Sequence, residues 1–379
     1  MMRVRNFGLA IMLAVVPAAR VSAQGSLSGL GFGYPVGGAS TRTGATAGAF
    51  GEFDLLSPIN PAALGSISRT VISAQTEPEF RTLRAGSTRE RTTAQRVPLL
   101  MLAFPVRKLA FALSATTFLD RSFSTTTTSD IIIDGKTVST TDQSDVRGAI
   151  ADLRLATGWR INNRFSVGVG AHMFTGDNVV ARSRIFADTT KFGNVLDSSR
   201  VVYFGSALSV GGEWRVRKGL AAMASFRRGG GIDSRVLDTV RTEANVPNRL
   251  GVSVRFDGIP GSIFAVGIEQ QVWSQMQSLG SSAVVPRDAT NWHAGAEVAG
   301  PRLRGSPMLL RAGYARNELP FGVGSRVVNE SRLSAGLGIP VAGEQASIDL
   351  SLQRANRLLS GGGAKESAWM LGVGLQIRP

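Results

Sequence analysis

Three arginines are the residues of this sequence best suited to bind a ligand: Arg154, Arg255 and Arg311. Each alternates with apolar neighbours, so on a β-strand its side chain would leave the face opposite to theirs. A guanidinium group can hold a carboxylate through two parallel hydrogen bonds. If these faces line an enclosed interior, the three arginines are candidate ligand-binding residues for a solute with a carboxylate. The alternative is that inward charges only pair with one another.

Catalytic and metal chemistry have little support in the sequence. It contains two histidines, His172 and His293, and no cysteine. We find no anchored serine–histidine or aspartate–histidine motif of the kind that barrel lipases and proteases need. Two histidines on distant strands are also weak evidence for a metal site. We therefore expect no enzymatic activity, no catalytic residues, no cofactor and no metal.

The candidate residues must be positioned by β-strands, because apolar side chains alternate with polar or small ones almost everywhere after residue 70. Fourteen segments follow this pattern: 70–80, 98–106, 108–121, 146–160, 164–176, 198–216, 219–229, 247–257, 262–275, 289–299, 307–318, 330–341, 346–358 and 366–378. Many exceed the length of about five or six residues that is usual for strands in soluble proteins. A tilted strand of about 9–11 residues is long enough to cross a bilayer.

The connections between these segments alternate between short turns and long polar stretches. Short turns include 160–164 and 257–261, and we expect long loops at 122–145, 177–197, 230–247 and 316–330. This alternation is typical of bacterial outer-membrane barrels, which have short periplasmic turns and long extracellular loops. The sequence therefore predicts an all-β protein with a 14-stranded antiparallel transmembrane β-barrel over residues 70–379. Both termini would lie on the periplasmic side of the bacterial outer membrane.

Residues 1–23 have the features of a secretory signal peptide. Arginines precede a short apolar run, and small residues before Gln24 provide a cleavage site. The formal net charge of the whole chain is +15. No basic stretch stands beside stacking aromatic residues, so nucleic acid is not an expected partner. We instead expect outer-membrane lipid and lipopolysaccharide to be the partners of this charge.

Residues 24–69 differ from the rest of the chain, because they are rich in glycine and do not alternate. A fourteen-stranded barrel leaves an open lumen, and we expect this stretch to fold into it as an N-terminal plug, or hatch. Near its end, Asn60 suits the start of a helix and Pro61 suits the first helical position before Ala62. The alternative is an ordinary loop cap with no transport role.

The motif Asn60-Pro61-Ala62 resembles the hatch signature of the FadL family, which are fourteen-stranded outer-membrane transporters of long-chain fatty acids and other hydrophobic compounds. Residues upstream of it fall at comparable points of the family pattern: Arg42, Gly44, Ala45, Gly48, Ala49 and Asp54. The PorV-type barrels, which are linked to a protein secretion system, are similar in this region too.

The resemblance implies a transport protein for hydrophobic or amphipathic solutes such as long-chain fatty acids. Such a small-molecule ligand would cross by passive diffusion through a barrel gated by the hatch. The alternative is a PorV-type outer-membrane component of a protein secretion system, which would bind partner proteins of that system.

Overall fold

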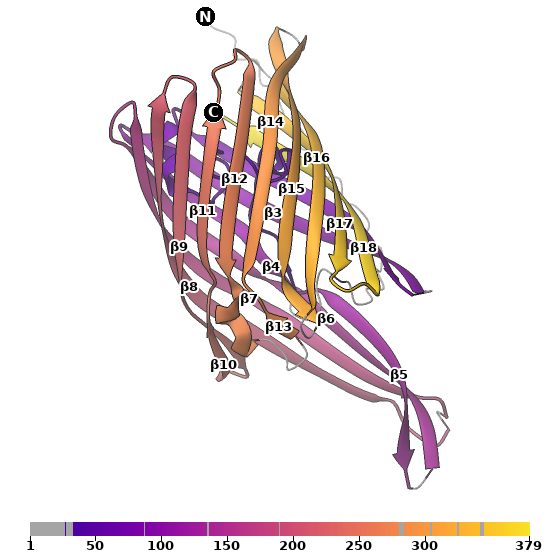
Figure 1. Cartoon of the computed structure of the whole chain (residues 1–379). Coiled ribbons are helices and arrows are strands. Elements are labelled where there is room, and N and C mark those ends of the chain that lie inside the picture. Colours follow the sequence, from indigo (N-terminus) through magenta and orange to yellow (C-terminus); the bar gives the residue numbers. More distant parts are fainter. Residues whose placement is uncertain are drawn as a thin grey trace, which may run out of the picture.

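The computed structural model describes Leu27 and residues 33–379, apart from residues 87, 135, 189, 280–283, 304, 324–325 and 342–344. The predicted signal peptide at residues 1–23 lies outside the described residues. Within the described part of the chain, fourteen antiparallel strands close into one barrel (Figure 1). The fold class predicted from the sequence is therefore confirmed.

The ring of strands follows the order of the chain. Its last strand pairs with its first from Ala364↔Ala85 to Ile377↔Ile72, which closes the barrel. The strands of the ring are β2 (Val71–Ala85), β3 (Thr88–Val106), β4 (Leu109–Asp120), β6 (Lys136–Arg160), β7 (Phe165–Phe186), β8 (Val195–Arg217), β9 (Leu220–Val236), β11 (Asn248–Phe256), β12 (Ser262–Val272), β14 (Ala289–Leu303), β15 (Ser306–Val323), β16 (Arg326–Val341), β17 (Ala346–Leu359) and β18 (Ala364–Ile377). The other described elements are β1 (Tyr34–Pro35), β5 (Phe123–Ile133), β10 (Thr239–Asn245), β13 (Val284–Pro286), the helix α1 (Thr41–Ala45), and the 3-10 helices η1 (Pro61–Ser66) and η2 (Trp273–Leu279).

The outer face of the ring is apolar. Along β18, Met370 and Gln376 point inward and are buried, and the exposed side chains are those of Trp369, Leu371, Val373, Leu375 and Ile377. Such a surface is unfavourable in water and favourable against hydrocarbon. The closed ring also pairs the backbone groups that a bilayer would leave without partners. Among the described residues, no helix is long and apolar enough to cross a membrane.

The long connections are mostly strands rather than loops. β5 pairs with β6 along its whole length, and β7 remains paired with β8 as far as Arg184↔Val195. β5 to β8 thus form a sheet that projects well beyond the ring (Figure 1). An ion pair at 2.6 Å between Arg184 and Asp142 joins β6 to β7 there. The prediction of loops at 122–145, 177–197, 230–247 and 316–330 was therefore wrong, because polar residues with β-branched neighbours can extend a hairpin as readily as they form a loop.

The N-terminal segment, defined here as residues 33–69, contacts the inner face of the ring on opposite sides. α1 contacts β15, β16, β17 and β18, whereas η1 contacts β4, β6, β7 and β8. β1 pairs with the end of β4 through Tyr34↔Asp120. The pairing of β4 with β3 stops earlier, at Leu99↔Thr116, so β1 pairs with a stretch of β4 that β3 has left.

The 3-10 helix η1 begins at the motif of Asn60, Pro61 and Ala62, as the sequence predicted. The Asn60 Oδ1 atom accepts a hydrogen bond from the Ala62 backbone N–H at 2.9 Å and so caps the helix. The Asn60 side-chain amide donates to the Ala224 carbonyl of β9 at 3.2 Å. The motif therefore both starts the helix and attaches it to the wall.

Three glycines on neighbouring strands make room for η1: Gly158 on β6, Gly168 on β7 and Gly211 on β8. A Cβ atom at Gly168 would lie 2.4 Å from the carbonyl carbon of Pro61. One at Gly211 would lie 1.9 Å from the side-chain oxygen of Asn60. Both distances are shorter than any van der Waals contact, so η1 can take this place only because these wall residues lack a side chain.

The opposite wall accommodates the end of α1 in the same way, through Gly295 on β14, Gly313 on β15 and Gly336 on β16. A Cβ atom at Gly313 would lie 2.3 Å from the carbonyl carbon of Thr46, and one at Gly336 would lie 2.4 Å from the Cβ atom of Ala45. The glycine faces of the alternating strands are thus the contact surface for the N-terminal segment.

We expect the substitution Gly211→Ala to destabilise the protein by about 1–3 kcal/mol, because the new methyl group would overlap Asn60. The neighbouring Gly212 is the matched control, since a Cβ atom there would have nothing within 4 Å. The free energy of unfolding would be measured by urea titration in lipid vesicles. An equal loss in both variants would show that the effect comes from the strand and not from the N-terminal segment.

Candidate functional site

The interior of the barrel contains cavities on both sides of the N-terminal segment. Two of them, of about 140 and 80 Å³, lie toward the long hairpins and share Trp273 and Glu269 as lining residues. A third, of about 340 Å³, lies toward the short turns and is lined by Pro307, Pro340 and Arg42. The N-terminal segment contributes lining residues to all three cavities.

The three candidate arginines lie on β6, β11 and β15, and their surroundings differ. Arg311 is neutralised, because its Nε donates to Glu297 at 2.6 Å and its Nη1 donates to Asp349. Arg255 forms an ion pair with a neighbour on its own chain segment, Asp257, at 3.2 Å. The alternative reading of paired interior charges therefore describes the geometry of these two arginines.

Arg154 differs from the other two, because it forms no ion pair with a carboxylate of the described residues and because two of its donors lack a partner, against one in Arg255. Its side chain is only 3 % exposed, yet neither Nε nor Nη2 has a hydrogen-bond partner among the described residues. Buried polar groups without partners are rare in proteins and carry a free-energy cost. Two buried donors on one planar guanidinium match what a carboxylate or another oxyanion needs.

A polar group surrounds Arg154 on the neighbouring strands. His172 of β7 lies opposite Arg154 in the strand register. The His172 ring contacts the Asp152 carboxylate through Nδ1 and the Ser209 hydroxyl through Nε2, at 2.9 Å in each case. Arg227 of β9 approaches the same carboxylate at 3.9 Å. Arg249 lies nearby as well, but it is paired with Glu52 at 2.8 Å and with Glu269 at 2.5 Å.

An apolar region adjoins this polar group on the side of the long hairpins. The Phe118 ring packs against Phe174 at 4.8 Å between centroids and stacks on Trp273 at 5.5 Å. We call the whole set the luminal apolar cluster, which consists of Phe118, Leu119, Ile150, Phe174, Tyr203, Ala207, Ile232, Val246, Trp273, Met276, Ala289 and Phe321. The interior thus has an apolar part beside a cationic part.

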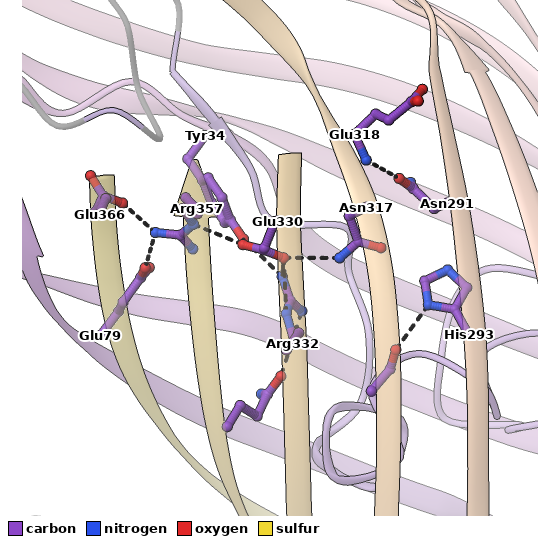
Figure 2. A network of polar contacts seen from close by, with 12 residues as sticks. Tyr34, Glu79, Asn291, His293, Asn317, Glu318, Glu330, Arg332, Arg357 and Glu366 are labelled. Carbon is purple, nitrogen blue, oxygen red and sulfur yellow. Dashed lines mark hydrogen bonds and ion pairs between the residues drawn. The ribbon is translucent and has the colours of Figure 1, made fainter. Parts of the chain in front are cut away.

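A second charged group fixes β1 to the wall (Figure 2). Arg357 of β17 is fully buried and lies 2.7 Å from both Glu79 and Glu330, and it also contacts Glu366. Its guanidinium lies over the Tyr34 ring at 4.7 Å. These carboxylates leave Arg357 no free charge for a ligand, so we assign this group to structure.

The helix α1 is anchored by Arg42, one of the residues in the family-like pattern. Arg42 donates to the Glu297 carboxylate of β14 at 2.9 and 2.6 Å. Burial disfavours the charged form of Arg42, but the Glu297 carboxylate outweighs it and raises the pKa of Arg42 above its ordinary value. Asp54, also in that pattern, accepts hydrogen bonds from Thr43 and Ser57 at 3.2 Å.

The two histidines have separate partners. The Nδ1 atom of His293 lies 2.9 Å from the Ala47 carbonyl of the N-terminal segment, whereas His172 belongs to the group around Asp152. In the part of the chain that the structure describes, no group of three or more potential ligands could hold a metal ion. Sequence reasoning missed Ser209, because only the pairing of β7 with β8 brings it to His172.

Removal of Arg357 tests whether the second charged group stabilises the barrel. We expect Arg357→Met to lower the free energy of unfolding by about 3–5 kcal/mol, because Glu79, Glu330 and Glu366 lose a buried cation that they share. The control is Arg184→Met in the exposed pair with Asp142, where we expect no measurable change. Both variants would be unfolded with urea in lipid vesicles, and equal stability of Arg357→Met and the wild type would contradict the assignment.

Comparisons with known proteins agree with the fold. The BamG family model matches residues 4–227, and no curated protein matches the chain. Similar solved structures include a Pseudomonas aeruginosa FadL homologue (TM-score 0.62, 12% identity, 90% of this chain and 98% of that chain covered) and the Ralstonia pickettii toluene transporter TbuX (TM-score 0.60, 12% identity, 90% and 99% covered). The P. putida toluene transporter TodX is also similar (TM-score 0.60, 10% identity, 91% and 99% covered). The chain belongs to the BamG family, and its fold is that of the FadL-type barrels.

Proposed function

We propose that the protein carries hydrophobic or amphipathic solutes across the bacterial outer membrane by passive diffusion through its lumen. The observation that carries this proposal is the luminal apolar cluster beside Arg154, two of whose buried donors have no partner in the described part of the chain. An apolar tail of the solute would replace water at the luminal apolar cluster. A carboxylate of the solute would pair with the guanidinium group of Arg154. A long-chain fatty acid has both parts. The toluene transporters TbuX and TodX, which have similar structures, support a hydrophobic solute.

Within this proposal, Arg154 is the ligand-binding arginine. Arg255 and Arg311 were equal candidates in the sequence, but both contact acidic side chains of the protein itself. A ligand carboxylate at either would have to compete with those contacts. At Arg154 it would instead provide partners for two donors, Nε and Nη2, that have none among the residues that the structure describes.

We further propose that residues 24–69 act as the hatch that gates this path. The described part of this stretch lines the cavities toward the long hairpins as well as the cavity toward the short turns. The motif of Asn60, Pro61 and Ala62 would hold one end of the hatch on β6 to β9, and Arg42 would hold the other end on β14. We also propose that residues 1–23 direct export of the chain and that both termini lie in the periplasm.

Trp273 offers a direct test of solute binding, because it belongs to the luminal apolar cluster and the other four tryptophans are exposed on the outside. In a variant with phenylalanine at those four positions, we expect a brominated long-chain fatty acid to quench the fluorescence of Trp273. Adding Arg154→Met should weaken this binding roughly 10- to 100-fold, because a charged hydrogen bond is lost.

Two controls make this test specific for the carboxylate. A brominated alcohol of the same length should bind with equal affinity with and without Arg154→Met, and Arg255→Met should leave fatty-acid binding unchanged. Absence of quenching at saturating fatty acid would refute binding in the lumen. Equal binding of the acid with and without Arg154→Met would refute the role of Arg154.

The gate is tested at its α1 anchor. We expect Arg42→Met to increase solute flux in a liposome-swelling assay, because α1 loses its two hydrogen bonds to Glu297. The exposed Arg69, at the other end of the N-terminal segment, gives the control variant Arg69→Met. Identical swelling rates for the wild type and both variants would count against a gating role of α1.

One observation favours the PorV-type alternative, in which the barrel binds proteins of a secretion system. β5 to β8 project beyond the ring, and apolar side chains there face solvent, with Ile132 77% and Leu196 79% exposed. We therefore propose protein binding as a second candidate function. Recovery of the same stoichiometric partner with the purified wild type, and its loss after the projecting part is shortened, would support this candidate. Recovery of the barrel alone would argue against it.

A further inference from the structure

Asp152, His172 and Ser209 form a hydrogen-bonded line that solute transport does not require. The Nδ1 atom of His172 lies 2.9 Å from both carboxylate oxygens of Asp152, and its Nε2 atom lies 2.9 Å from the Ser209 Oγ atom. All three side chains are buried. A carboxylate, an imidazole and a hydroxyl in this order are the groups with which hydrolases activate a serine nucleophile.

The strand register explains why the three side chains meet. Arg154 lies opposite His172 across β6 and β7, and Gly170 lies opposite Ser209 across β7 and β8. Asp152 and Ser209 are therefore diagonal neighbours of His172 on the same inward face, within reach of a ring side chain. Three hydrogen-bonded strands of a closed wall hold the line in place, so its geometry is preorganised.

The hydrogen bonds also set the direction of proton transfer. A carboxylate can only accept hydrogen bonds, so the His172 Nδ1 atom carries the proton that faces Asp152. The Nε2 atom is then an acceptor and faces the Ser209 hydroxyl. This tautomer is the one that allows His172 to remove the proton of Ser209 as a general base.

Arg154 provides donors beside the nucleophile. A Cβ atom at Gly170 would lie 2.6 Å from Ser209 Oγ and 2.8 Å from Arg154 Nε, so both atoms border the same small space above this glycine. Arg154 Nε and Nη2 have no partner among the described residues. Preorganised donors beside the attacked carbon are what a developing oxyanion requires.

The line faces a cavity of about 80 Å³ whose lining includes His172, Ser209, Phe118 and Trp273. One water molecule occupies about 30 Å³ in the liquid, so this volume suits a group of only a few heavy atoms. The aromatic rings make one side of the cavity apolar. The cavity therefore suits a short acyl group, with the remainder of a substrate directed toward the wider lumen.

We propose that the protein hydrolyses short-chain carboxylic esters at Ser209. Ser209 Oγ attacks the ester carbonyl carbon while its proton moves to His172 Nε2, and Arg154 stabilises the oxyanion. The bond to the alkoxy oxygen breaks, and His172 returns the proton to the departing alcohol. Water then attacks the acyl-serine, gives its proton to His172 and releases the acid, after which His172 reprotonates Ser209. Asp152 is a positioning residue that holds the tautomer of His172.

Two reagents test this activity on the full-length mature barrel, whose folding is checked by its heat-dependent gel mobility. p-Nitrophenyl acetate measures turnover, and phenylmethylsulfonyl fluoride measures covalent modification of the nucleophile by peptide mass. We expect the wild type to hydrolyse the ester and to be sulfonylated at Ser209. We expect Ser209→Ala to do neither, and Asp152→Asn to slow both reactions roughly 10²–10⁴-fold.

The matched control is Ser334→Ala, which removes a buried wall serine on β16, far from His172 in the strand order. This variant should retain wild-type rates. A folded wild type that shows neither hydrolysis above the buffer rate nor sulfonylation would overturn the proposal, and so would full activity of a folded Ser209→Ala variant. Quenching of Trp273 fluorescence by the fatty acid measures solute binding and does not depend on Ser209. The proposals of solute transport and of ester hydrolysis can therefore fail independently.

Discussion

The structure depends on the absence of side chains at a few inward positions of the barrel wall. Gly168, Gly211 and Gly313 let the N-terminal segment approach the strands more closely than any Cβ atom would allow. The same residues make the inner face of each strand small and its outer face large. One pattern of alternation therefore provides both the apolar surface for the membrane and the space in which the N-terminal segment is held.

Charge in the interior is arranged under a second constraint, which is that a buried ion needs compensation. Arg311 and Arg357 satisfy it with carboxylates from neighbouring strands, and Arg42 does so between the N-terminal segment and β14. These contacts attach interior and wall to one another. Arg154 departs from the rule, because it forms no ion pair with any described carboxylate and two of its buried donors have no hydrogen-bond partner there. We therefore assign a role in binding or chemistry to Arg154 and a structural role to the paired arginines.

Much of the fold could be predicted because strand alternation is a local property. The segment at 366–378 predicted β18 within two residues at its start and one at its end, and Asn60 with Pro61 predicted the start of η1. The projecting hairpins were harder to predict, since the polar residues of β5 suit a solvated loop as well as a strand. The line of Asp152, His172 and Ser209 could not be predicted. Its members are 20 and 37 residues apart, and only the pairing of three strands determines which side chains meet.

The contacts of the N-terminal segment with opposite walls bear on the order in which the barrel and this segment fold. α1 lies against β15 to β18 and η1 against β4 and β6 to β8, so a finished cylinder would have to admit the segment through its mouth and then form every contact at once. A sheet that is still open can instead curl around the segment. On that route we expect the pairing of β2 with β18 to form last, after the sheet has closed around the N-terminal segment.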